Sequence, residues 1–162
     1  MLTRVRVQND SEIDELLKVI HPIWKEVFTP IIGSAQVAYM LENYQGKQMI
    51  QEEIDNGVYY YQLYYDDQAV GYTAYQITAN YLYLSKIYIK QEYRGHGLMR
   101  QIFDWYDQLS KELSLKQHLR VNQGNELAIA VYKKRGFKQV REDIVDIGKG
   151  FQMVDYIFEK NS

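Results

Sequence analysis

The chain has 162 residues, of which 46% are hydrophobic and 25% charged, and its formal net charge is -2. This size fits one domain, so we expect a single domain over residues 1–162. The chain has no Lys/Arg block of the kind that binds nucleic acid, and no run of ~20 apolar residues that could span a membrane. Its first residues do not resemble a signal peptide, so the cytoplasm is the expected location. Cys is also absent, which excludes disulfides, thiolate metal ligands and a cysteine nucleophile.

The N-terminal segment predicts a strand followed by a helix. Thr3–Gln8 alternates as a short strand does, and Asp10 or Ser11 offers an N-cap to the helix that follows. The apolar residues of this helix keep helical spacing as far as Trp24. Pro22 is expected to kink or end the helix, because proline has no N–H to donate and its ring clashes with the preceding turn.

A second helical stretch and three strands come next. The helical stretch runs from about residue 34 to residue 56, and Gly46 offers a point at which it splits in two. Residues 58–65 and 69–78 are rich in aromatic and β-branched side chains around a short polar turn, which is the pattern of a hairpin. Residues 81–90 add a third strand, so these segments predict an antiparallel meander.

The second half of the chain alternates helices and strands. From Gly97 the apolar residues keep helical spacing, and residues 118–122 form a short strand, so a parallel crossover is expected. A helix over residues 125–135 and two strands over 137–147 and 152–159 complete the chain. The order β-α-α-β-β-β-α-β-α-β-β predicts a mixed α/β fold, with a central mixed sheet of about seven strands and helices on both faces.

The chain contains 16 Tyr against 5 Phe, and many of these tyrosines lie between Tyr59 and Tyr88. In one interpretation they are large, half-buried aromatic residues that suit a pleated sheet and carry a hydroxyl to its wet side. In the other, some of the rings line a site for a cationic amine, which the face of an aromatic ring attracts. The composition alone leaves both interpretations open.

The segment from Tyr88 to Met99 is a strand followed at once by an Arg-Gly-x-Gly turn and an amphipathic helix. The first N–H groups of a helix have no intrahelical partner and lie at the positive end of its dipole, and glycines let the backbone approach closely. Such a turn suits a phosphate, and Arg94 adds a positive charge. The alternative is that Gly95 and Gly97 only make a tight turn.

A second informative segment lies about 30 residues further on, from Asn125 to Phe137. Together the two segments resemble motifs of the GNAT superfamily of acetyltransferases, whose patterns are Gln/Arg-x-x-Gly-x-Gly/Ala and Asn-x-x-Ala-x-x-x-Tyr-x-x-x-Gly-Phe. The second pattern is met at every fixed position, by Asn125, Ala128, Tyr132, Gly136 and Phe137. The first is met by Arg94 and Gly97 but departs at Met99, where the family has Gly or Ala.

The resemblance implies a GNAT-like sheet and an enzyme that uses acetyl-CoA as cosubstrate, with no metal. The pyrophosphate of acetyl-CoA is expected beside Arg94, on the N–H groups of Gly95, His96, Gly97, Leu98 and Met99. The pantetheine is expected to pair like a strand along Ile87, Tyr88 and Ile89. Asn125 is expected to contact the cofactor, and Lys134 or Arg135 to reach the 3′-phosphate.

Tyr132 falls where many relatives place a general acid that protonates the departing thiolate of CoA. The chemistry needs such a group, because a protonated thiolate leaves more easily, and it also needs a backbone donor for the oxyanion, expected near Ile87. The alternative for Tyr132 is a core aromatic residue on the buried face of its helix.

A general base is not evident, because the Glu that many relatives carry on the strand before the glycine turn is missing. A water chain, or Glu52 or Glu53 from the preceding helix, would have to act as the base instead. His96 lies in the turn, where a solvent-facing role is the simpler one, and His21 and His118 have no evident partner.

The stretch from Asp146 to Lys160, with the strand Lys86–Ile89, looks like the PaiA-type branch of the superfamily, which acetylates polyamines such as spermidine. The expected activity is therefore acetyl transfer to a primary amine of a small molecule by direct attack in a ternary complex, and the family also suggests a homodimer. A protein N-terminal or lysine acetyltransferase, a non-catalytic CoA-binding module and a domain with no cofactor are the alternatives.

Overall fold

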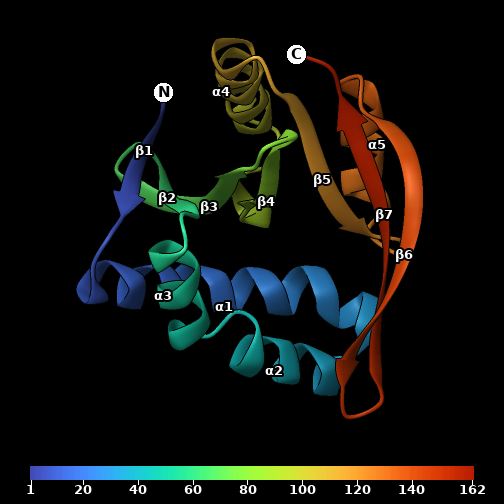
Figure 1. The fold of residues 1–162 in the computed structure, drawn as a ribbon. Coiled ribbons are helices and arrows are strands. Elements are labelled where there is room, and N and C mark those ends of the chain that lie inside the picture. The colour runs from blue at the N-terminus through green and yellow to red at the C-terminus, as the bar shows by residue number, and fades with distance from the viewer.

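The computed structural model describes residues 1–162, which form one seven-stranded sheet with helices on both faces (Figure 1). The strands are β1 (Leu2–Val7), β2 (Tyr59–Tyr65), β3 (Gln68–Ile77), β4 (Tyr81–Ile89), β5 (Lys116–Asn122), β6 (Lys138–Gly148) and β7 (Phe151–Lys160). The helices are α1 (Asp10–Ile32), α2 (Ser34–Asn43), α3 (Lys47–Asp55), α4 (Leu98–Leu113) and α5 (Glu126–Lys134), with a short 3-10 turn at Gln91–Tyr93. The predicted mixed α/β fold and its number of strands are confirmed.

The first helix begins with a different cap from the one expected. Asn9, and not Asp10 or Ser11, is the N-cap of α1, and its side-chain oxygen accepts a hydrogen bond from the Glu12 N–H at 2.9 Å. The Glu12 carboxylate in turn accepts from the Asn9 N–H at 3.2 Å. This position is favoured because the Asn-x-x-Glu spacing satisfies two backbone donors reciprocally.

Pro22 does not end α1, which continues through Pro22 and Pro30 to Ile32. A proline inside a helix costs about 3 kcal/mol, but burial of one large apolar side chain contributes about 1.5–3 kcal/mol. Several side chains along this helix are buried against the sheet: Ile13, Leu16, Val19, Ile20, Ile23, Trp24 and Phe28. Packing of this face outweighs the local preference, and the helix ends only at Gly33, where φ is 84°.

The second helical stretch is divided into α2 and α3, and the break lies at Tyr44, Gln45 and Gly46. A Cβ at Gly46 would lie 2.7 Å from the carbonyl oxygen of Glu42, so the chain can turn this closely only with glycine at this position. The division places Gln45 at the junction of the two helices, where its side chain is 5% exposed.

The predicted meander and parallel crossover are both present. Strands β2, β3 and β4 pair antiparallel, and β4 pairs parallel with β5 after α4 crosses between them. The β4–β5 pairing joins only Tyr81–Tyr83 to Lys116–His118, and a bulge then leaves Ser85 without a partner on β3. Beyond this point β4 and β5 diverge, as Figure 1 shows, and the facing edge of β4 has no ladder partner.

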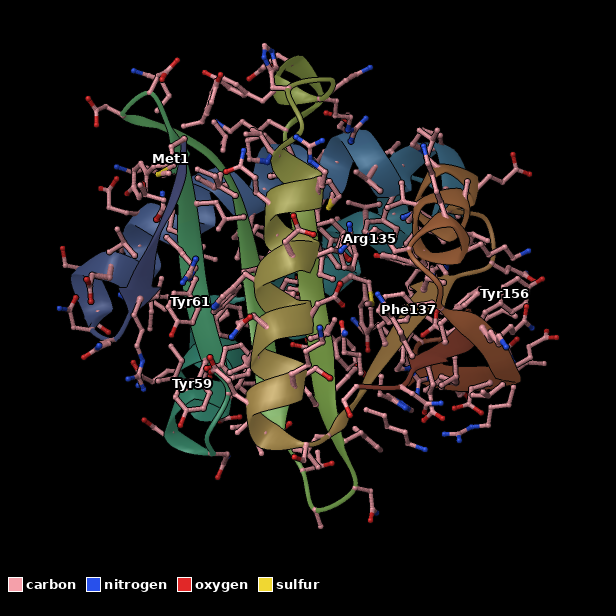
Figure 2. The ribbon with its side chains drawn as sticks, turned by 90° about the horizontal axis from the view of Figure 1, so that it is seen from above. Met1, Tyr59, Tyr61, Arg135, Phe137 and Tyr156 are labelled. Atoms are coloured by element: carbon pink, nitrogen blue, oxygen red, sulfur yellow. The ribbon has the colours of Figure 1, made fainter.

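The sheet separates two apolar cores. Helices α1, α2 and α3 cover one face, where Tyr72 accepts a hydrogen bond at its hydroxyl from the Trp24 indole N–H at 3.0 Å. Helix α4 lies across the other face, with Tyr59 and Tyr61 of β2 to one side of it and Arg135 and Phe137 to the other (Figure 2). Apolar side chains therefore cover both faces of the sheet, and a large open space lies where β4 and β5 part.

Asp107 of α4 ties this helix to α5 and to the end of β7. Its carboxylate accepts hydrogen bonds from Gln117 at 2.7 Å, from Arg135 at 2.9 Å and from Lys160 at 3.0 Å. Burial alone would raise the pKa of Asp107, but the hydrogen bonds from Gln117 and Lys160 and the charges of Lys160 and Arg135 outweigh it, so the pKa lies below its ordinary value.

A lowered pKa means that the ionised Asp107 stabilises the fold above the pKa it has when unfolded, and that this contribution disappears as the pH falls through the folded-state value. We expect Asp107→Asn to lower the free energy of unfolding at pH 7 by about 1–2 kcal/mol, and to lower it by less at about pH 2, below the ordinary aspartate range. Urea unfolding at both pH values measures this. Asp104→Asn is the matched control, since the exposed Asp104 binds only Arg135; an equal loss at both pH values would rule out a charge effect.

Candidate active site

A cavity of about 860 Å³ lies where β4 and β5 diverge, and α1, α5 and the turn before α4 complete its walls. Most of the residues predicted from the motifs line it: Ile87, Tyr88, Ile89, Arg94, Gly95, Gly97, Leu98, Met99, Asn125 and Tyr132. His96 and Lys134 do not line the cavity and are exposed. The His96 ring lies 5.7 Å from the Tyr65 ring, in keeping with a solvent-facing position.

The turn before α4 leaves the helix N-terminus open. Gly97 is the N-cap and has a left-handed conformation with φ 72°, and no side chain caps the helix. Gly95 also has a positive φ of 86°, and nothing lies within 4 Å of where its Cβ would stand. The first N–H groups of α4 therefore lack an intrahelical partner and a side-chain cap beside the cavity, which is the arrangement that binds an anion.

The charges around this turn are partly paired. The Arg94 guanidinium donates to the Glu26 carboxylate of α1 at 2.9 Å, so Arg94 holds α1 to the turn as well as adding a positive charge. Arg135 does not line the cavity, because it donates to Asp104 and Asp107. Asn125 is the N-cap of α5, and its side-chain oxygen accepts from the Ala128 N–H at 3.4 Å.

Tyr132 is a buried aromatic residue that also reaches the cavity. Its ring is buried against Phe103, Phe137 and Phe158, with ring centroids 5.8, 6.0 and 6.3 Å away. The residue also lines the cavity, and its hydroxyl has no hydrogen-bond partner within the protein. Burial raises the pKa of Tyr132 above its ordinary value, so the hydroxyl keeps its proton at neutral pH and can donate it.

Some of the tyrosines pack within the fold, and others line the cavity. Tyr60, Tyr72 and Tyr106 are fully buried, and Tyr59 and Tyr75 stack with centroids 4.9 Å apart. Four others line the cavity: Tyr83, Tyr88, Tyr93 and Tyr132. Aromatic packing therefore accounts for many of these residues, and the rings of four others border the open space.

The cavity wall away from α4 carries polar groups that the motifs did not reveal. Lys86 of β4 lines the cavity without an ion pair, and burial lowers its pKa, opposed by the charge of Glu53. Gln45 is also in this wall, and its buried Oε1 has no donor in the protein. An unsatisfied buried oxygen costs about 1–3 kcal/mol, so a ligand N–H at this point is favoured.

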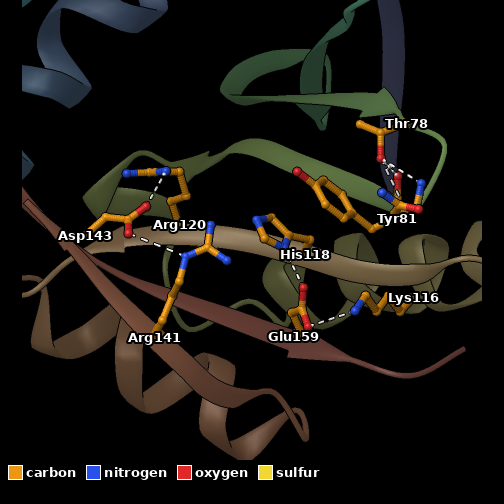
Figure 3. A network of polar contacts seen from close by, with 9 residues as sticks. Thr78, Tyr81, Lys116, His118, Arg120, Arg141, Asp143 and Glu159 are labelled. Carbon is orange, nitrogen blue, oxygen red and sulfur yellow. Dashed lines mark hydrogen bonds and ion pairs between the residues drawn. The ribbon is translucent and has the colours of Figure 1, made fainter. Parts of the chain in front are cut away.

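An ion-pair network crosses β5, β6 and β7 beside this wall. Arg120 of β5 donates to Asp155 of β7 at 3.4 Å and to Asp143 of β6 at 3.1 Å, and Figure 3 shows the second of these contacts. Arg120 and Asp155 line the cavity, whereas Asp143 does not. Burial raises the pKa of Asp155 even though Arg120 opposes the shift, so this carboxylate takes up a proton more readily than an ordinary aspartate.

Two expectations about other residues need correction. His118 has a partner, since its Nδ1 lies 2.7 Å from the Glu159 carboxylate and its ring stacks on Tyr81 at 4.0 Å (Figure 3). It lies outside the cavity, as do Glu52 and Glu53. Glu53 instead accepts a hydrogen bond from the Tyr60 hydroxyl at 2.8 Å, so neither candidate for the base from α3 borders the open space.

Comparison with known families identifies the class of protein. Residues 29–160 match the model of the acetyltransferase (GNAT) domain, which spans most of the chain. The chain therefore belongs to the GNAT acetyltransferase family and is an N-acetyltransferase that uses acetyl-CoA as its cosubstrate. No helix has the length and apolar character needed to cross a membrane, and no group of three or more His, Asp or Glu side chains could hold a metal ion.

Solved structures of acetyltransferases share the fold. A PaiA N-acetyltransferase from Thermoplasma acidophilum, crystallised with coenzyme A, is 20% identical and superimposes with a TM-score of 0.80 over 100% of this chain and 99% of that one. A GCN5-related N-acetyltransferase from Rhodopseudomonas palustris has a TM-score of 0.79 at 11% identity, covering 99% and 95% of the two chains. An alanine N-acetyltransferase of a ribosomal protein from Escherichia coli reaches 0.63 at 17% identity, covering 99% and 94%.

Proposed function

We propose that this enzyme transfers the acetyl group of acetyl-CoA to a primary amine of a small molecule, by direct attack within a ternary complex, and that a polyamine such as spermidine is the first acceptor to test. The observation that carries the proposal is a single cavity that joins an uncapped helix N-terminus, an unpaired tyrosine hydroxyl and a wall of aromatic and polar side chains. These are an anion site, a proton donor and an amine site, side by side.

The divergence of β4 and β5 supports a position for acetyl-CoA between these two strands. The pyrophosphate binds the N–H groups from Gly95 to Met99, beside Arg94. The pantetheine pairs with the free edge of β4 along Ile87–Ile89, where no other strand competes for the backbone groups. Its thiol end then points toward Tyr132, and a backbone N–H near Ile87 serves the oxyanion.

The aromatic wall of the cavity, where we expect the acceptor to bind, favours a slender amine. Trp24 and Phe28 of α1 line the cavity with ring centroids 4.2 Å apart, and Tyr88 lies 6.1 Å from Phe28. Three aromatic rings at one wall attract an ammonium group and pack along an alkyl chain. The unpaired Gln45 oxygen adds an acceptor for its N–H groups. A polyamine has both features, which supports it as the first acceptor.

An acceptor screen tests the proposal. Purified protein is incubated with acetyl-CoA and with spermidine, other small amines or a peptide with a free N-terminus, and free CoA is measured as it is released. Release with spermidine or another small amine, without release on the peptide, supports the proposal. Release only with the peptide identifies a protein acetyltransferase instead. Thermal stabilisation by acetyl-CoA without turnover on any acceptor identifies a non-catalytic CoA-binding module.

The glycine turn gives a prediction about cosubstrate affinity. We expect Gly97→Ala to weaken acetyl-CoA binding about 10-fold, because a Cβ in the left-handed region costs about 1–2 kcal/mol and shifts the N–H groups that hold the pyrophosphate. Isothermal titration calorimetry measures the change. Gly57→Ala is the control, since Gly57 has φ 94° and no neighbour within 4 Å but lies outside the cavity. If both variants bound acetyl-CoA equally well, the turn would not be the pyrophosphate site.

A further inference from the structure

The cavity has three carboxylates in its walls, and only one is placed to receive an acceptor amine. Glu26 already pairs with Arg94 at 2.9 Å, beside the turn that suits the pyrophosphate. Glu126 lies in the first turn of α5 and is exposed. Asp155 is 15% exposed, and its one hydrogen bond to a donor is the 3.4 Å contact with Arg120. Of the two carboxylates away from Arg94, Asp155 is the less exposed, so its charge is less screened by water toward an ammonium group in the cavity.

Asp155 also lines the same cavity as Tyr88 of β4 and the proton donor Tyr132. Burial raises the pKa of the Tyr88 hydroxyl, and the charges of Tyr72, Tyr132 and Asp155 add to this shift. Asp155 pairs across the strands with Asn122, the last residue of β5 before the loop that leads to α5. The carboxylate and the tyrosine proton donor therefore face one space.

We propose that Asp155 is the general base of this enzyme: it binds the ammonium group of the acceptor and removes its first proton, while Arg120 acts as the positioning residue that holds the carboxylate. This inference rests on the proposed acetyl transfer to an amine. It also accounts for the missing Glu on β4, because β7 supplies the carboxylate from the other side of the cavity. Lys86 is less suited to the role, since its protonated form repels an ammonium.

With Asp155 as base and Tyr132 as acid, every proton in the reaction has a donor and an acceptor. The acceptor R–NH3+ gives one proton to the Asp155 carboxylate, and the neutral nitrogen attacks the thioester carbonyl carbon, so that a C–N bond forms. The C–S bond then breaks, and Tyr132 gives its proton to the leaving sulfur to form the free thiol of CoA. The nitrogen loses its second proton to the Tyr132 phenolate, which restores the hydroxyl, and Asp155 releases its proton to solvent.

The surroundings of Asp155 determine the expected pH dependence. Arg120 faces it from β5, Asp143 from β6, and Tyr83 and Tyr88 from β4. Burial raises the pKa of Asp155, Asp143 adds to this shift, and Arg120 opposes it. A base must be ionised to act, so kcat/KM for the acceptor should fall as the pH decreases through this raised pKa. The acidic limb of the profile should lie above the ordinary aspartate range.

The decisive variant is Asp155→Asn, which keeps the shape of the side chain and a hydrogen-bond acceptor for Arg120. We expect kcat/KM for the acceptor to fall about 100-fold or more, the acidic limb to disappear and acetyl-CoA affinity to stay unchanged. Asp143→Asn is the matched control, because Asp143 binds the same Arg120 at 3.1 Å outside the cavity. It should keep the full kcat/KM above the acidic limb and move that limb only to lower pH, since a negative charge near Asp155 is lost. Arg120→Gln should keep the limb and move it to higher pH, since a positive charge beside Asp155 is lost.

The outcomes separate the two proposals. If the unaltered enzyme acetylated no amine, the proposed function itself would fail. If it acetylated an amine and Asp155→Asn matched it in rate and pH profile, only the assignment of the base would be wrong. Equal losses in Asp155→Asn and Arg120→Gln, with an unshifted acidic limb in the latter, would reduce Asp155 to a structural partner. Loss of the limb in Lys86→Met, but not in Asp155→Asn, would transfer the role to Lys86.

Discussion

Replacing Tyr132 by Phe is expected to lower kcat about 100-fold or more and to leave acetyl-CoA affinity and the free energy of unfolding nearly unchanged. Loss of a positioned general acid costs about 10²–10⁴-fold in rate. The stability should hold because the aromatic ring, which packs against Phe103, Phe137 and Phe158, remains, and the hydroxyl that is removed has no partner in the protein. Stopped or continuous measurement of CoA release with saturating substrates gives kcat directly.

Tyr88→Phe is the matched control for this variant. Tyr88 is also a tyrosine of the cavity wall, and burial raises its pKa too, but it lies on β4 and not at the position of the proton donor. A change of cavity polarity alone would lower the rate of both variants to a similar extent, whereas a role as general acid affects only Tyr132→Phe. Because burial raises the pKa of Tyr132, the unaltered enzyme should also keep its kcat at pH values near 10, where about half of an ordinary tyrosine is ionised.

The parts of the site that the sequence could predict are local. The glycine turn and the Asn-to-Phe segment each combine a backbone requirement with a short spacing, so their residues appear together in the chain as well as in space. Gly95 and Gly97 have the positive φ angles that such a turn needs, and Asn125 caps the helix that carries Tyr132. Motifs of this kind can therefore be recognised in the sequence without knowing how the strands of the sheet pair.

The parts that could not be predicted depend on contacts between distant segments. Arg120 and Asp155 are 35 residues apart, and they meet only because β7 inserts between β5 and β6 in a particular register. His118 and Glu159 meet for the same reason. A one-residue slip in that register would turn every side chain of β7 to the opposite face, and alternation along a strand does not specify which strand becomes its neighbour.

The course of α1 illustrates the same limit. Pro22 carries a strong local signal for a helix end, but the apolar face of α1 packs along the sheet on both sides of that residue. The energy of this packing becomes visible only once the sheet is known. The cavity wall formed by Trp24 and Phe28 depends on this outcome, since both residues lie beyond the proline.

Gly71→Ala is expected to destabilise the fold by about 3 kcal/mol and to weaken acetyl-CoA binding as well. Gly71 of β3 pairs with Ile89 of β4, and a Cβ added to it would collide with the carbonyl oxygen of Tyr88. That atom belongs to the backbone of a central strand, so the strand itself must shift, and overpacking of this kind costs about 1–3 kcal/mol or somewhat more. The segment that moves is the one proposed to pair with the pantetheine.

Chemical unfolding and calorimetric titration with acetyl-CoA measure the two effects of Gly71→Ala. Gly150→Ala, at the tip of the β6–β7 hairpin, is the control for the generic cost of replacing a glycine, because its φ of 79° is unfavourable for alanine but nothing lies within 4 Å of the new Cβ. We expect that control to lose about 1 kcal/mol and to keep its affinity. If Gly71→Ala were no less stable than Gly150→Ala, β3 and β4 would not approach as closely as the structure requires. If it lost stability but bound acetyl-CoA normally, the Ile87–Ile89 edge would not carry the pantetheine.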